Sequence, residues 1–169
     1  THISFTEHAI STSTDGATDV YATDMDGDGD MDVLSASQYD DKIAWYENDG
    51  SGSFTEHVIS IGNIGNNPNT VYAVDVDGDG YMDVLSASEG DDKIVWYEND
   101  GSENFTEHVI STSADGAHSV HAADVDSDGD LDVLSASYYD DKIAWYENDG
   151  SENFTEHVIS TSADGARSV

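Results

Sequence analysis

Carboxylates recur in one nine-residue pattern that appears three times in this 169-residue chain. Each copy has Asp at positions 1, 3, 5 and 9 and Gly at position 6, and the copies occupy residues 24–32, 75–83 and 124–132. A hard cation such as Ca²⁺ binds about six to eight oxygen ligands. The four carboxylates, the backbone carbonyl of position 7 and a water molecule would supply them. The pattern therefore predicts three Ca²⁺ sites, one in each copy.

The predicted ligands take the same positions in every copy. Because position 7 uses only its backbone carbonyl, Tyr81 can replace the Asp that the other two copies have there. Glycine at position 6 suits a tight loop, since it adopts positive φ without steric cost. The predicted metal residues are Asp24, Asp26, Asp28, Asp30, Asp32, Asp75, Asp77, Asp79, Tyr81, Asp83, Asp124, Asp126, Asp128, Asp130 and Asp132.

The pattern opens like an EF-hand loop, which would place the ion between two helices. An EF-hand closes with a bidentate Glu at position 12, but position 12 here is Ser35, Ser86 or Ser135. Each copy continues into Val-Leu-Ser-Ala-Ser, a short segment typical of a strand. We therefore expect the ion on a loop between two strands. The alternative is an Asp/Gly-rich turn without a metal, in which the facing carboxylates would repel one another in all three copies.

A repeat of about 50 residues carries these loops. The phrase Phe-Thr-Glu-His-(Ala/Val)-Ile-Ser begins at Phe5, Phe54, Phe105 and Phe154, and the longer middle spacing comes from an insertion within residues 62–69, a loop by composition. Each period contains four short segments without an apolar period of 3.6 residues, which predicts strands and no helices. Four antiparallel strands in each tandem unit predict an all-β fold of β-propeller blades. A β-helix would have shorter rungs, and an immunoglobulin-like sandwich would need about seven strands per unit.

The expected organisation is a single repeat domain over residues 1–169. In the third unit, the four strands are expected at residues 119–124, 131–137, 142–147 and 154–160. The parts are a leading fourth strand within residues 1–11, full blades over 12–60, 61–111 and 112–160, and the start of a next blade over 161–169.

Aromatic residues and histidines recur at fixed places in the units. Ile43 and Trp45 share one face of the third strand, with Ala44 and Tyr46 on the other. A sugar could stack on such a Trp, but its recurrence in every unit favours packing between blades. The Thr-Glu-His phrase resembles a catalytic or zinc pair, but its recurrence favours a surface position on the fourth strand. We therefore expect no enzymatic activity.

Composition excludes some partners and favours a location. The chain has 37 acidic and 4 basic residues, a formal net charge of −33 and no Cys. Nucleic-acid binding needs a basic surface, so we expect no nucleic-acid partner. No hydrophobic run is long enough to insert into a membrane. Calcium loops suit an extracellular setting, so we expect a secreted or cell-surface protein. No signal peptide opens the sequence, which favours a mature or excerpted form of such a protein.

The Asp-x-Asp-x-Asp-Gly-x-x-Asp pattern, repeated about every 50 residues together with Lys-Ile-Ala-Trp-Tyr-Glu-Asn, resembles the FG-GAP/VCBS repeat family. Its members include the integrin α-subunit head, fungal calcium-dependent lectins and many bacterial secreted proteins. The resemblance covers essentially the whole chain. The Phe-Gly and Gly-Ala-Pro signatures are absent, so the chain is most similar to the bacterial-type branch. The resemblance implies propeller blades, usually seven, with Ca²⁺ between the first and second strands of each.

Two classes of function are compatible with these features. The first is an extracellular binding or adhesion module, lectin-like, that recognises a glycan or a protein. The second is a purely structural repeat that assembles into rings or filaments with other copies of itself or with further blades of a longer chain. Positions at which the units differ are the candidate ligand-binding residues, although drift of exposed loop tips explains them equally well. They are Gln38, Tyr39, Glu89, Tyr138, Tyr139, His118 and His121.

Overall fold

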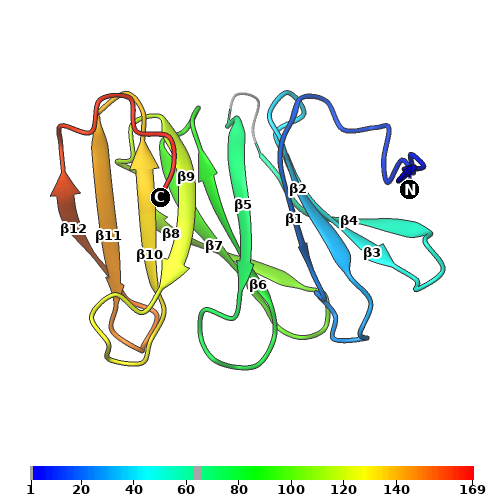
Figure 1. Ribbon diagram of the computed structural model, residues 1–169. Coiled ribbons are helices and arrows are strands. Elements are labelled where there is room, and N and C mark those ends of the chain that lie inside the picture. The colour runs from blue at the N-terminus through cyan, green and yellow to red at the C-terminus, as the bar shows by residue number, and fades with distance from the viewer. Residues whose placement is uncertain (1, 63–65) are drawn as a thin grey trace.

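The computed structural model describes residues 2–62 and 66–169, and within these ranges the chain forms twelve strands and no helix (Figure 1). None of the described residues therefore forms a helix that could span a membrane. The strands make three separate antiparallel sheets, which we call blades 1, 2 and 3. Blade 1 contains β1 (Ala17–Thr23), β2 (Asp32–Ser37), β3 (Lys42–Asn48) and β4 (Phe54–Ile61); blade 2 contains β5 (Pro68–Val74), β6 (Asp83–Ser88), β7 (Lys93–Asn99) and β8 (Phe105–Ser111); blade 3 contains β9 (Ala117–Ala123), β10 (Asp132–Ser137), β11 (Lys142–Asn148) and β12 (Phe154–Ser160).

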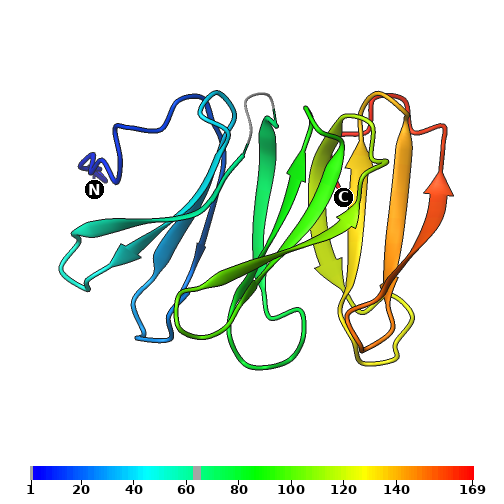
Figure 2. The same ribbon diagram turned by 180° about the vertical axis from the view of Figure 1, so that it is seen from behind.

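Each blade is an up-and-down meander in which sequence neighbours pair in order. This confirms the predicted all-β fold of four-stranded antiparallel blades. In blade 3 the observed strands begin and end within two residues of the predicted positions. Blades 1 and 3 lie at opposite ends of the row with blade 2 between them, so the row is open (Figures 1 and 2). Part of the predicted insertion loop, residues 63–65, lies outside the described residues.

The strand register gives each blade two different faces. In blade 1, Leu34 pairs with Trp45 and Ala36 with Ile43, whereas Val33 pairs with Tyr46. Because side chains alternate across a strand, these pairs point to opposite sides of the sheet. The Trp face of a blade is defined by its Leu, Ala, Ile and Trp at these positions, and the Tyr face by its Val, Ala and Tyr on the other side. These residues are Leu34, Ala36, Ile43 and Trp45 against Val33, Ala44 and Tyr46 in blade 1, Leu85, Ala87, Ile94 and Trp96 against Val84, Val95 and Tyr97 in blade 2, and Leu134, Ala136, Ile143 and Trp145 against Val133, Ala144 and Tyr146 in blade 3.

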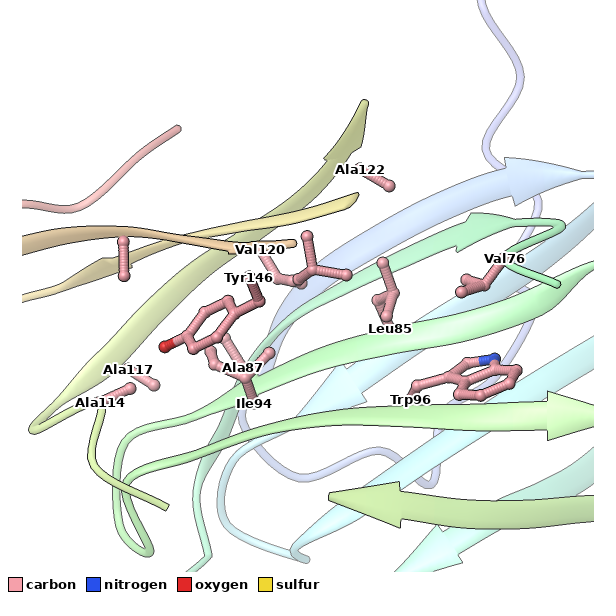
Figure 3. Close-up of a cluster of buried hydrophobic side chains, with 12 residues drawn as sticks. Val76, Leu85, Ala87, Ile94, Trp96, Ala114, Ala117, Val120, Ala122 and Tyr146 are labelled. Carbon is pink, nitrogen blue, oxygen red and sulfur yellow. The ribbon is translucent and has the colours of Figure 1, made fainter. Parts of the chain in front are cut away.

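The core lies between blades, where the Trp face of one blade packs on the Tyr face of the next. Leu85, Ile94 and Trp96 of blade 2 form one buried cluster with Val120 and Tyr146 of blade 3 (Figure 3). The corresponding residues of blades 1 and 2 form the other cluster. Trp45 and Trp96 are fully buried there. The prediction that the tryptophans pack between blades is therefore confirmed for these two.

The first strands of the blades, β1, β5 and β9, contact one another along one edge of the row. The Thr18 hydroxyl donates to the carbonyl of Pro68 at 3.0 Å, and the Thr70 hydroxyl to the carbonyl of His118 at 2.6 Å. Tyr72 makes edge-on ring contacts on both sides, at centroid distances of 5.1 Å to Tyr21 and 4.7 Å to His121. These contacts fix the position of each blade relative to its neighbour. They therefore also fix the positions of the loops of neighbouring blades relative to one another.

The leading strand expected within residues 1–11 is not observed. Residues 2–9 have no regular structure, and Phe5 is exposed. A fourth strand is held by the ladder to the third strand of its own blade, as β4 is by β3. Among the described residues no strand pairs with this segment, so it has the residues of a strand but no ladder partner.

Candidate metal centre

The three Asp-rich loops lie along the same rim of the row, each between the first and second strands of its blade (lower edge of Figure 1). Each loop leads directly into a strand, beginning at Asp32, Asp83 or Asp132. The prediction of a strand-to-strand loop is therefore confirmed, and the EF-hand arrangement is excluded. Every blade presents one such loop, so any ion bound there would recur once per repeat.

Each loop brings three carboxylates together, those of positions 1, 3 and 9. In each group, one oxygen from every residue lies within 4.8 Å of the others. Oxygen ligands lie about 2.3–2.6 Å from Ca²⁺, so two opposite ligands are about 4.6–5.2 Å apart and this spacing fits the ion. The groups are Asp24, Asp26 and Asp32; Asp75, Asp77 and Asp83; and Asp124, Asp126 and Asp132.

Backbone N–H groups hold the first carboxylate of the loop in place. In blade 1, Gly27 N donates to Asp24 Oδ1 at 2.8 Å and Gly29 N to Asp24 Oδ2 at 3.1 Å. Gly29 has a φ of 97°, which an L side chain rarely adopts. Glycine at position 6 is thus required by the turn that wraps the backbone around the Asp24 carboxylate.

The position 9 carboxylate joins the loop to the third strand. In blade 2, Asp83 is buried; its Oδ2 accepts from Val76 N at 3.0 Å and its Oδ1 from Asn99 N at 2.8 Å. Asp32 and Asp132 make the same two bonds, with distances of 2.8–2.9 Å. A carboxylate oxygen has a second lone pair, so Asp83 can accept these bonds and also bind a cation.

Burial and mutual repulsion disfavour the charged form of some of these carboxylates. Burial raises the pKa of Asp83 from 3.8 to about 6, despite the two backbone N–H bonds. Burial, and then the neighbouring carboxylates, also raise the pKa of Asp26 and Asp77. A divalent cation bound in each loop would favour the charged form of Asp26, Asp77 and Asp83 and so reverse this effect.

A buried donor adjoins the blade 2 group. The indole Nε1 of Trp96 is buried and makes no hydrogen bond within the described residues. It lies close enough to Asp83 to oppose the rise in that carboxyl's pKa, but without the geometry of a hydrogen bond. Figure 3 shows this nitrogen on the side of the ring toward Val76, position 2 of the loop. An unpaired buried donor fits a site that holds one more acceptor, such as a metal-bound water.

The remaining predicted ligands lie outside these three-carboxylate groups. The position 5 residue, Asp28 in blade 1, is exposed and accepts a hydrogen bond from the N–H of Asp30 at 2.8 Å; Asp79 and Asp128 do the same in their loops. The position 7 side chains, those of Asp30, Tyr81 and Asp130, lie against the turn between the third and fourth strands. The position 7 side chains thus point to a neighbouring turn. Metal binding by the position 5 carboxylate and by the carbonyl of position 7 stays a prediction.

Five of the candidate ligand-binding residues lie on the opposite rim, at the turns between second and third strands, and His118 lies close to them at the start of β9. Gln38 N and Tyr39 N donate to the carbonyls of Gly16 and Asp15, which ties this turn to the segment before β1. His121 lies apart from the rim, on β9 against Tyr72. The structure therefore separates Gln38 and Tyr39 on blade 1 from the other rim candidates on blades 2 and 3.

A cluster between blades 2 and 3 gathers the other candidates. The Tyr139 hydroxyl donates to Glu89 Oε1 at 2.7 Å. The guanidinium of Arg167 lies over the ring of Tyr138, 4.6 Å from its centroid, and the carbonyl of Arg167 contacts His118 Nδ1 at 3.1 Å. We call Glu89, Tyr138, Tyr139, His118 and Arg167 the rim cluster. Sequence reasoning missed Arg167; its being the only Arg in the chain was the available signal.

The recurring histidines support packing on the outermost strands. His57, His108 and His157 stack on the Trp of the neighbouring third strand, at ring-centroid distances of 4.4–4.6 Å. Each also contacts a Glu of that strand through Nε2, at 2.6–2.8 Å. The stacking and the contact with Glu account for the recurrence of Thr-Glu-His in the full units.

The model of the FG-GAP-like repeat matches residues 24–86, 75–135 and 124–169. Each match begins at position 1 of one Asp-rich loop, so each matched repeat contains one carboxylate group. The chain belongs to the FG-GAP-like repeat family. The FG-GAP repeat thus accounts for one three-carboxylate group in each blade of this chain.

Comparison with solved structures adds support for the fold. An Agrocybe aegerita lectin that recognises non-reducing terminal N-acetylglucosamine aligns with a TM-score of 0.58 at 18% identity. The alignment covers 89% of this FG-GAP-repeat chain and 42% of the lectin, so the chain spans less than half the length of that protein. At this identity the likeness concerns the fold alone. The search of curated proteins gave no match.

Proposed function

We propose that this FG-GAP-repeat chain is a calcium-binding module that acts outside the cell, without catalysis of its own, and recognises a glycan or a protein. The observation that carries the proposal is the group of three carboxylates in every blade, all along one rim of the row. One ion per blade would join the loop to the strands on both sides of it. The ions would thereby stiffen the blades that present the opposite rim.

Calcium is the cation that suits this donor set best. All three grouped donors are carboxylate oxygens, which hard cations prefer, whereas zinc sites use nitrogen and sulfur. Mg²⁺ requires nearly ideal octahedral geometry and keeps several waters, so a flexible loop favours Ca²⁺. Three Ca²⁺ would also reduce the self-repulsion of a chain whose formal net charge is −33.

The rim cluster is the proposed ligand surface. Tyr139 offers an exposed aromatic ring with the acceptor Glu89 at its edge, and Arg167, stacked over Tyr138, offers a donor nearby. An aromatic face with hydrogen-bonding groups at its edge is suited to a sugar ring or to a polar protein loop. The likeness in fold to a glycan-binding lectin is compatible with the first of these.

A purely structural repeat that assembles with other blades is the second candidate function. The observation in its favour is the Trp face of blade 3, where Leu134, Ile143 and Trp145 are only half-buried. The equivalent residues of blades 1 and 2 are fully covered by the following blade. The blade faces and the rim turns are different surfaces, but they share one segment, residues 161–169, which contains Arg167 of the rim cluster.

Calorimetric titration of the metal-free chain with CaCl₂ and with MgCl₂ tests the metal sites. We expect three Ca²⁺ per chain and weaker Mg²⁺ binding. Asp77→Asn should remove one site and leave two, because Asp77 is exposed and the loss of one charge there leaves the fold intact. Exposed Asp115 lies outside the groups, so Asp115→Asn is the matched control and should keep three. Absence of Ca²⁺ binding, or three sites in Asp77→Asn, would contradict the proposal.

A glycan array, probed with the chain in calcium and in chelator, tests the ligand surface. Tyr139→Ala should abolish any calcium-dependent signal, whereas Tyr39→Ala, at the equivalent exposed position of blade 1 and outside the rim cluster, should leave it unchanged. Binding that survives Tyr139→Ala would place the ligand elsewhere.

A further inference from the structure

The Trp face of blade 3 is not covered by another sheet within the described residues. Position 2 of the metal loop shows the difference: Val125 is 43% exposed, whereas the equivalent Met25 and Val76 are 3% and 5% exposed. On the outermost strand, Ile159 is exposed, whereas the equivalent Ile59 and Ile110 pack against the clusters. An apolar surface of this kind on a highly charged chain marks an interaction site.

The Tyr face of blade 1 is open in the same way at the other end of the row. Val20 is 66% exposed, whereas the equivalent Val71 and Val120 are 2% and 4% exposed. Residues 8–14 line a shallow pocket over part of this face, together with Val33 and Tyr46. The segment is itself exposed, and it leaves Val20 uncovered.

These two open faces match the two faces that already pack together inside the chain. Blade 3 packs on blade 2 through its Tyr face and through two residues of its first strand on the same side. These residues are Val133, Ala144 and Tyr146, with Val120 and Ala122. Blade 1 has the same five residue types at the same five positions, namely Val20, Ala22, Val33, Ala44 and Tyr46. The Trp face of blade 3 likewise has the same Leu, Ala, Ile and Trp as blade 2. The two open faces therefore carry the same residues as two faces that pack on each other inside the chain.

We propose that a second copy of this chain docks head to tail, so that the Trp face of blade 3 of one copy covers the Tyr face of blade 1 of the next. The contact repeats the two interfaces within the chain and is therefore heterologous. It leaves one open face at each end of a pair, and successive docking closes a ring or extends a filament. The proposal rests on the packing of the blades and does not require the rim to bind a ligand.

Two short segments must move aside for this contact. Residues 161–169 repeat the sequence of residues 12–20 in most positions, and their end lies beside β9, where Val169 N donates to the Ser119 hydroxyl at 3.3 Å. The first strand of a docking copy would take this place. Residues 8–14 must likewise leave the Tyr face of blade 1. Both segments are largely exposed and outside the sheets, so the blades themselves need not change.

Charge sets the condition for docking, and here the inference draws on the proposed calcium binding. Within the chain, Asp77 of the blade 2 loop lines a common pocket with Asp130, Gly150 and Glu152 of blade 3. Docking would bring the blade 3 loop equally close to Asp30 of the next copy. Carboxylates of two chains repel there unless cations reduce the charge. Calcium, or high salt through screening, should therefore promote docking.

Sedimentation velocity of the full chain over a wide concentration range, in calcium, tests the docking. We expect species that grow with concentration from the 18.1 kDa chain, the first of them twice that mass. Repeating the series in chelator with high NaCl separates the two proposals: association there would support docking even if calorimetry finds no Ca²⁺ binding. A chain that stays monomeric at every concentration in both conditions would overturn the proposal.

Charged substitutions on each open face identify the surfaces. Val20→Asp and Ile159→Asp alter residues that are exposed in the single chain, so each variant should fold and remain monomeric. Val58→Asp and Val158→Asp are matched controls. Val58, Val109 and Val158 are 47–52% exposed, both in blades 1 and 2, whose Trp faces are covered by the next blade, and in blade 3, whose Trp face is open. Both controls should associate like the unaltered chain.

Mixing the two face variants distinguishes a head-to-tail contact from a symmetric one. Val20→Asp keeps an intact Trp face, and Ile159→Asp keeps an intact Tyr face, so an equimolar mixture should form a one-to-one pair and nothing larger. Association of either variant alone to the extent of the unaltered chain would overturn the assignment. A mixture that remains monomeric while the unaltered chain associates would also overturn it.

Discussion

Asp83 accepts a hydrogen bond from the backbone N–H of Asn99 at 2.8 Å, and this bond ties the metal loop of blade 2 to the end of its third strand. The Asn99 side chain returns the connection by donating to the carbonyl of Met82 at 3.1 Å. Blades 1 and 3 repeat both bonds. Position 9 of the loop is therefore a structural corner of the blade as well as a proposed metal ligand.

Asp83→Ala should destabilise the chain even without metal, because it leaves two buried backbone N–H groups unpaired. Hydrogen bonds to charged groups contribute about 1.5–3 kcal/mol each, so we expect a loss of about 3 kcal/mol or more in the free energy of unfolding. Asp77→Ala, at an exposed position of the same group, should destabilise only in calcium. Urea unfolding of both variants in calcium and in chelator measures this; equal losses in chelator would contradict the dual role of Asp83.

Removal of calcium should lower the melting temperature of the unaltered chain strongly. A ligand that binds only the folded state stabilises it by about 2.7 kcal/mol per site at a hundredfold excess over its dissociation constant. Three sites act on one small domain, so we expect a decrease of tens of degrees in chelator. Differential scanning calorimetry checks this, with Mg²⁺ in place of Ca²⁺ as control. An unchanged melt in chelator would refute a stabilising role for the ion.

In chelator, stability should fall as the pH rises from about 4 to about 7. Burial raises the pKa of Asp83 to about 6, above the ordinary value of 3.8. The folded chain thus binds this proton more tightly than the unfolded chain, and the resulting stabilisation, complete below the unfolded pKa, is lost as the pH passes through about 6. A shift of this size corresponds to up to about 3 kcal/mol.

Urea unfolding of the chelated chain at several pH values measures the effect of Asp83. Because the large net charge adds its own pH dependence, the readout is the difference between the unaltered chain and Asp83→Asn. The variant should show the smaller decrease, and saturating calcium should remove the decrease from the unaltered chain. Identical pH profiles of the two proteins would show that Asp83 titrates normally.

Replacement of the tryptophans should have unequal costs in the three blades. Trp96 is fully buried between blades 2 and 3, so Trp96→Ala should cost about 3–5 kcal/mol. Trp145, which occupies the same position on the open face of blade 3, is only half-buried. Trp145→Ala should therefore lower the free energy of unfolding distinctly less. Urea unfolding at a concentration where the chain is monomeric compares them. Equal losses would mean that the Trp145 face is already covered in the single chain.

The sequence by itself determined the strands, the blades and the positions of the metal loops. These features depend on local properties, namely alternation along a strand, turn residues and the spacing of carboxylates within nine residues. Recurrence also sufficed to place the tryptophans between blades, because a large aromatic side chain at one position of every unit suits a packing contact that every pair of blades shares.

Tertiary structure alone decided which copies of an identical local sequence are covered. Trp45 and Trp145 lie in two identical heptapeptides, yet Trp45 is buried and Trp145 is half-buried, because within the described residues another blade packs on Trp45 and none packs on Trp145. Residues 2–9 match a fourth strand but remain irregular, since a strand needs a ladder partner that its own residues cannot supply. The contact of Tyr139 with Glu89 joins residues 50 positions apart, and local spacing carries no information about such a meeting.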